Sequence, residues 1–126
     1  MKPSFPLLFV SHGAPMFAIE PGLAGKNLTE LGRELPRPDA IVILSPHWMT
    51  RDEISVTAST SPETIHDFGG FPDALYQIQY PAPGAPALAS KIVDMLSNTG
   101  WKSRLDDHRG LDHGAWVPLL YLAPEA

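Results

Sequence analysis

Short continuous runs of apolar residues mark the first strands that this sequence predicts. Residues 6–11 and 40–45 are such runs, with almost no polar side chains inside them. This pattern is typical of strands that are buried on both faces, as in a parallel sheet. Residues 53–58 alternate in part between apolar and polar and predict a third strand, and residues 101–105 predict a short further one. The apolar pattern therefore favours a sheet whose strands are mostly parallel.

Helical patterns separate the predicted strands. Residues 28–34 lie between the first two runs and end at a pair of prolines, which cannot continue a helix. In residues 85–98 the apolar side chains recur at helical spacing, and residues 114–122 are apolar on nearly all sides, as in a buried helix. The order of these elements predicts an α/β fold with βαβ units, in which a mostly parallel sheet is flanked by helices. We expect a single domain over residues 1–126.

The composition predicts that this fold is incomplete by itself. Charged residues make up 18% of the chain, against a typical share of about 25%. Few charges mean little solvated surface, so we expect further protein to cover part of the chain. Proline is frequent, with 14 in 126 residues, and residues 59–83 combine prolines with glycines and aromatic residues. A connection of this length without regular structure is often a binding loop or a lid.

Charge and hydropathy exclude several classes of function. The net charge is −5, and the nine Lys and Arg residues are scattered, so we expect no nucleic-acid partner. No apolar stretch approaches the roughly 18 residues of a membrane span, and the N-terminus does not resemble a signal peptide. The chain has no cysteine, which excludes disulfides and thiolate metal sites. We therefore expect a cytoplasmic protein without a membrane partner.

Two histidines follow the first two predicted strands at matching positions. His12 and His47 each come one or two residues after the last apolar position of their run. Because the carboxyl ends of parallel strands meet at one edge of a sheet, the two imidazoles can converge on one metal ion. The alternative is a pair of hydrogen-bonded loop histidines without a role in function. On the pattern alone both interpretations stay open.

Further candidates lie in the long loop and at the last predicted helix. His113 stands at the start of that helix, where an imidazole tends to stay neutral and can hydrogen-bond a substrate. We treat it as the candidate catalytic residue. We treat Asp112, which precedes it, and His66 and Phe68 of the loop as candidate substrate-binding residues. The alternatives are that Asp112 only caps the helix and that the two loop residues only anchor the loop.

Several motifs together resemble those of a known family. They are residues 8–16, 38–48, 67–72, 80–86 and 110–119, which occur in this order along the entire chain. Jointly they resemble the class III extradiol ring-cleavage dioxygenases, in the branch that includes the 4,5-DOPA extradiol dioxygenases. A histidine–glycine pair after a strand is a weak signal alone, whereas five motifs in the family's order are a specific one.

The resemblance implies a metal-dependent oxygenase. His12 and His47 would bind Fe(II), or Zn(II) in the isolated protein, and His113 would contact substrate or oxygen. The substrates would be O₂ and a small aromatic diol, a catechol similar to DOPA, whose ring is opened. Members of the family are about twice this long, and their third metal ligand and acid–base histidine lie in the C-terminal half. This chain would then be the N-terminal part of one catalytic domain, with a second half or a homo-oligomer as its partner.

Two other functions remain compatible with the sequence. One is a zinc hydrolase on a similar sheet, in which Asp67 would be the base that activates a zinc-bound water. The other is a non-catalytic metal-binding or interaction module that keeps the fold. Turnover of a catechol with iron, activity with zinc alone, and metal binding without turnover distinguish the three.

Overall fold

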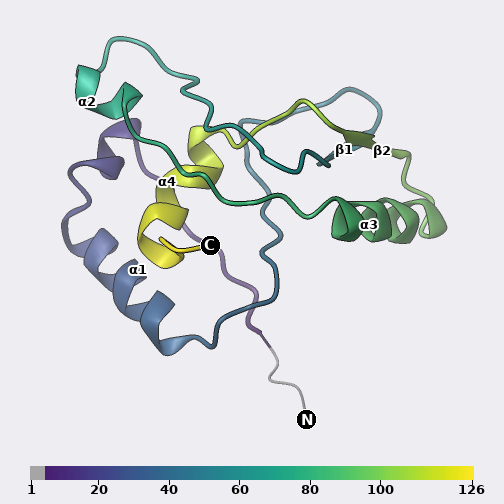
Figure 1. Cartoon of the computed structure of the whole chain (residues 1–126), viewed down its shortest axis with the longest axis horizontal. Helices are drawn as coiled ribbons and strands as arrows, with labels where there is room; N and C mark the ends of the chain where they lie inside the picture. Colours follow the sequence, from purple (N-terminus) through teal and green to yellow (C-terminus); the bar gives the residue numbers. More distant parts are fainter. Residues whose placement is uncertain (1–4) are drawn as a thin grey trace.

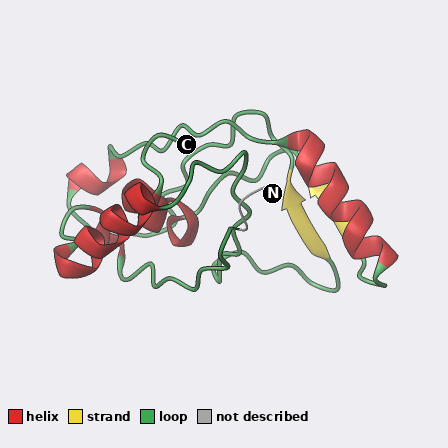
Figure 2. Cartoon of the chain, turned by 90° about the horizontal axis from the view of Figure 1, so that it is seen from below, coloured by secondary structure: helices red, strands yellow, loops and turns green. Residues whose placement is uncertain are grey.

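The computed structural model describes residues 5–126, and its elements lie at two ends of the molecule. A helical cluster occupies one end, and a small sheet with one helix occupies the other, with long loops between them (Figures 1 and 2). In chain order the elements are the 3-10 turn η1 (Pro15–Ala18), α1 (Gly22–Glu34), β1 (Ile54–Thr57), α2 (Asp73–Tyr76), α3 (Pro86–Asn98), β2 (Ser103–Asp106) and α4 (His113–Leu122). None of the helices in residues 5–126 has both the length and the apolar character that crossing a membrane requires.

The sheet is a parallel pair joined by a helix. β1 pairs with β2 in parallel, with Ile54 opposite Ser103 and Thr57 opposite Asp106. Parallel strands need a long crossover connection, and α3 supplies it while packing against both strands (Figure 1). This βαβ unit confirms the predicted α/β fold with parallel strands, and the strands predicted at residues 53–58 and 101–105 are present.

The core forms around α4. Trp116 and Val117 are completely buried, and the indole Nε1 of Trp116 donates a hydrogen bond to the Ile65 carbonyl at 2.9 Å. α1 packs against α4 so closely that a Cβ added at Gly32 would collide with the Leu122 carbonyl. The prediction of a helix that is buried on most sides is therefore confirmed. α1 begins six residues before the predicted helix start at residue 28.

Tyr80 ties the long loop to the end of α4, and its hydroxyl donates to the Ala123 carbonyl at 2.5 Å. Burial raises the pKa of Tyr80 from 10 to about 12. The folded state therefore holds this proton more tightly than the unfolded state, and the resulting stability is complete below pH 10 and lost as the pH rises toward 12. Tyr80→Phe is expected to cost about 1 kcal/mol at neutral pH and to remove this alkaline loss. Urea unfolding at pH 8 and pH 11 measures both effects, and an alkaline loss equal to the parent's would refute the assignment.

The structure does not form the strands predicted at residues 6–11 and 40–45. Within residues 5–126 neither segment has a strand partner or a backbone hydrogen bond to the other segment (Figure 1). The prediction that both faces are buried is also wrong, because Leu7 and Phe9 are fully exposed and Leu44 is 94% exposed. Strand hydrogen bonds need a neighbouring strand, and the described residues provide none here. The apolar pattern is present, but none of the described segments pairs with it.

Candidate metal centre

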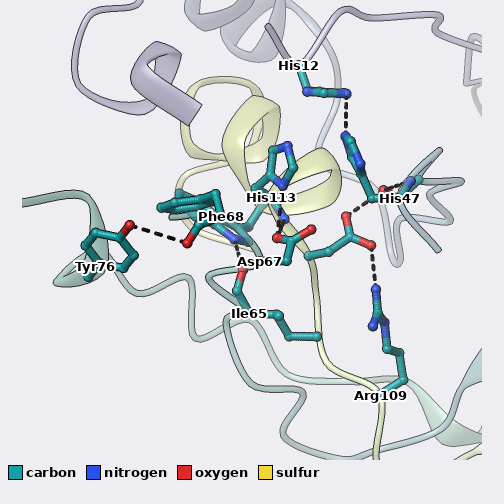
Figure 3. A network of polar contacts seen from close by, with 11 residues as sticks. His12, His47, Ile65, Asp67, Phe68, Tyr76, Arg109 and His113 are labelled. Carbon is teal, nitrogen blue, oxygen red and sulfur yellow. Dashed lines mark hydrogen bonds and ion pairs between the residues drawn. The ribbon is translucent and has the colours of Figure 1, made fainter. Parts of the chain in front are cut away.

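Three histidines from separate parts of the chain meet at one point (Figure 3). His12 and His47 follow the two apolar segments, and His113 is the first residue of α4. The Nε2 atoms of His12 and His47 lie 3.1 Å apart. The ring centre of His113 is 4.1 Å from that of His47 and 5.2 Å from that of His12. The structure thus brings together the two predicted metal ligands and the predicted catalytic residue, which we call the histidine cluster.

The spacing of the nitrogen atoms fits a metal ion. Two imidazole nitrogens bound to one ion at about 2.1 Å, at an angle of about 90° to 110°, lie about 3.0 to 3.4 Å apart. The observed separation of the His12 and His47 Nε2 atoms is 3.1 Å. In addition, Nδ1 of His12 is buried and has no hydrogen-bond partner among residues 5–126. Neutral imidazoles are ligands that suit iron and zinc, so the residues present fit such an ion.

Similar turns hold the two outer histidines. The Ser11 hydroxyl accepts the Gly13 N–H at 3.2 Å, and the Ser45 hydroxyl accepts the His47 N–H at 3.2 Å. Serine side chains commonly hold turns by bonding the backbone two residues ahead. Gly13 has φ +61°, and a Cβ added there would lie 3.2 Å from Cβ of Phe17. Glycine is therefore required immediately after His12, both for the backbone conformation and for the space.

Asp67 orients His113. Oδ1 of Asp67 accepts the backbone N–H of His113 and its ring Nδ1–H, both at 2.9 Å. Partial burial acts to raise the pKa of Asp67, but the hydrogen bonds from His113 outweigh it and lower the pKa below its usual value. Since an ionised carboxylate can only accept, Nδ1 of His113 carries a proton, and the neutral imidazole has its lone pair at Nε2. His113 can therefore accept a proton or bind an ion through Nε2.

The predicted substrate-binding residues differ in how they relate to the histidine cluster. The ring of Phe68 meets that of His113 nearly at right angles, with centres 5.8 Å apart, so Phe68 borders the histidine cluster. The ring of His66 contacts that of Phe68, and Nε2 of His66 hydrogen-bonds the Ile78 carbonyl at 2.8 Å. Asp112 is buried, and both of its carboxylate oxygens bind other protein groups. A substrate-binding role for these residues stays a prediction, with its best geometric support at Phe68.

Sequence reasoning missed three contacts of this site. It did not pair Asp67 with His113, which lies 46 residues further along the chain, and no local spacing signals such a pair. It also missed the bond from Ser45 to Asp112, across 67 residues. The contact between Arg109 and Asp112 spans only three residues, and opposite charges at that spacing were an available signal.

Comparison with known proteins decides the family. Residues 6–126 match the family model described as the catalytic LigB subunit of aromatic ring-opening dioxygenase. The chain belongs to this family. It is 49% identical over 122 residues to the 4,5-DOPA dioxygenase extradiol of Escherichia coli (strain K12), covering 96% of this chain and 44% of that protein. The 4,5-DOPA dioxygenase extradiol of Beta vulgaris is also 49% identical over 122 residues, covering 94% of this chain and 45% of that protein.

These matches confirm the resemblance that the motifs indicate. The 4,5-DOPA dioxygenase extradiol of Mirabilis jalapa is 40% identical over 121 residues, again with 94% of this chain and 45% of that protein covered. The chain therefore spans less than half the length of these curated relatives.

Proposed function

We propose that this chain is the metal-binding N-terminal half of an extradiol dioxygenase domain, which opens the ring of a DOPA-like catechol with non-haem Fe(II) and O₂. The observation that carries this proposal is the 3.1 Å separation of the His12 and His47 Nε2 atoms beside His113, in a chain of the ring-opening dioxygenase family. Two histidine ligands leave positions on an ion free for substrates, as in other non-haem iron oxygenases. Zn(II) would occupy the same nitrogen ligands in protein isolated without iron.

The residues of this chain supply positioning and proton handling. A bound Fe(II) ion would supply the redox chemistry between the diol and O₂. His113, with its free Nε2 lone pair, accepts the proton of a substrate hydroxyl, and Asp67 stabilises the resulting imidazolium through Nδ1–H. Phe68 provides a flat apolar wall beside His113 that suits an aromatic ring and excludes water.

The zinc hydrolase has less support. It would need a carboxylate to activate a zinc-bound water, and Asp67 already uses Oδ1 to hold both the backbone and the ring of His113. The match to the family of ring-opening dioxygenases supports the dioxygenase instead. We therefore favour the dioxygenase over the hydrolase.

We also infer that the remaining half of the domain covers the open face, defined as Leu7, Phe9, Val42 and Leu44. These four side chains are strongly exposed, whereas Ile43 between two of them packs against the core. A large exposed apolar patch marks an interaction surface, and relatives about twice as long have the protein to cover it. A second copy of this chain is the alternative occupant.

The proposed function is tested in a chimera in which this chain replaces the matched part of the Escherichia coli relative. With Fe(II) added anaerobically, we expect oxygen uptake on addition of DOPA. His113→Ala should lower kcat by about 10²- to 10⁴-fold, as for loss of a general base, while iron content is unchanged. His108→Ala, an exposed histidine outside the cluster, is the control. A folded, iron-loaded chimera that consumes no oxygen would refute the function, and loss of iron in His113→Ala would show that this residue is a ligand.

A further inference from the structure

Asp112 is a buried carboxylate whose oxygens both have partners. The residue is 2% exposed. Oδ1 accepts a hydrogen bond from the Ser45 hydroxyl at 2.5 Å, and Oδ2 accepts one from Nη2 of Arg109 at 3.0 Å. A charge is seldom buried unless it is paired and hydrogen-bonded. Both carboxylate oxygens of Asp112 are thus engaged by protein groups, and its burial calls for an explanation other than contact with a substrate.

The hydrogen bonds around Asp112 have a defined direction. A carboxylate can only accept, so the single hydroxyl proton of Ser45 points to Asp112. The lone pairs of the same hydroxyl then face the backbone N–H of His47, which donates to it at 3.2 Å. Asp112 therefore fixes the orientation of Ser45, and Ser45 fixes the backbone of His47.

The first turn of α4 packs directly against the turn that carries His47. A Cβ added at Gly114 would lie 2.9 Å from Cδ2 of His47 and 3.1 Å from Oδ1 of Asp112. The absence of a side chain at Gly114 lets the first turn of α4 approach the His47 ring this closely. The helix and the hydrogen bonds thus both contact the turn that carries His47.

Arg109 also contacts the turn that carries His47. Its guanidinium pairs with Asp112 and also lies over the ring of Trp48, 5.4 Å from the ring centre. Trp48 directly follows His47, so Arg109 contacts the turn both through Asp112 and through its neighbour. In Figure 3 the dashed line from Arg109 marks its ion pair with Asp112. The backbone N–H of Arg109 donates to Oδ1 of Asp106 at 2.8 Å, which holds the start of this side chain.

We propose that Asp112 is a positioning residue for the metal ligand His47, acting through the Ser45 hydroxyl, with Arg109 balancing its charge. The inference rests on the metal site of the proposed function. It assigns Asp112 to the support of a ligand and not to contact with substrate. Groups that orient metal ligands in this way reduce the freedom that is lost when the ion binds.

Titration of the metal-free chain with Co²⁺ tests the proposal. Ser45→Ala removes the hydroxyl that links Asp112 to the His47 backbone but leaves Asp112 and Arg109 in place. It is expected to weaken Co²⁺ binding about 10- to 100-fold, the usual effect of losing such a support, and to change the ligand-field spectrum of the bound ion. Ser45→Thr keeps a hydroxyl and should restore both. The matched control is Ser59→Ala, because the Ser59 hydroxyl accepts the Ser61 N–H at the same 3.2 Å in a turn outside the histidine cluster.

The outcomes separate this proposal from the metal site itself. Parent-like Co²⁺ affinity and spectrum in folded Ser45→Ala would overturn the positioning role, as would an equal loss in Ser59→Ala. Unchanged Co²⁺ binding in both His12→Ala and His47→Ala would instead overturn the metal site. Circular dichroism of the metal-free variants checks the fold. If Ser45→Ala does not fold, Asp112→Ala decides in its place, because it removes the oxygen that accepts the Ser45 hydroxyl, and parent-like affinity would again overturn the proposal.

Discussion

His12→Ala and His47→Ala are each expected to abolish tight metal binding. The Nε2 atoms of His12 and His47 lie 3.1 Å apart. Each substitution removes one of these two nitrogen ligands, so the ion keeps only one histidine of the pair. The expected loss exceeds the roughly 10- to 100-fold that removing a supporting hydrogen bond costs. Metal content after dialysis against a defined Fe(II) or Zn(II) concentration measures the effect directly.

The control for this experiment is His108→Ala. His108 is exposed and lies outside the histidine cluster, so its replacement should leave metal content unchanged. Retention of full occupancy in either His12→Ala or His47→Ala would remove the metal site from this protein. A loss of metal in His108→Ala equal to that in the other two variants would show that the binding is unspecific.

A completing polypeptide should order the two apolar segments and tighten metal binding. We expect the C-terminal part of the Escherichia coli relative, added to this chain, to bind the open face and pair residues 6–11 and 40–45 as strands. Covering a Val, Leu or Phe side chain contributes about 1.5 to 3 kcal/mol, so the four side chains of the open face favour association strongly. Size-exclusion chromatography detects the complex, and amide hydrogen exchange of the two segments should slow within it.

Two matched substitutions test whether the added polypeptide binds at the open face. Leu44→Asp places a charge in the open face and should prevent the complex, whereas Met95→Asp, at an exposed apolar position on α3, should not. Binding that survives Leu44→Asp would refute the proposed face. If the chain instead forms a dimer that Leu44→Asp disrupts, and the added polypeptide does not bind, the occupant is a second copy.

Local patterns in the sequence were sufficient for several features. The apolar character of residues 114–122 predicts the buried helix α4, and the strands near residues 53–58 and 101–105 with a helix between them predict the parallel βαβ unit. The equivalent positions of His12 and His47 predict that their rings meet, and they do, although the two strands on which that prediction relied do not form. The helix and the strands depend on side chains within a few residues of one another, and such information is present in a single sequence.

Tertiary structure alone decided how the site is supported and which strands form. Asp67 meets His113, and Asp112 meets Ser45, only because the fold brings distant segments together. Residues 6–11 have a strand pattern but no strand, because a backbone pairs only when a neighbour is present. A sequence specifies which environment each segment requires. Whether that environment exists depends on every other segment that packs against it.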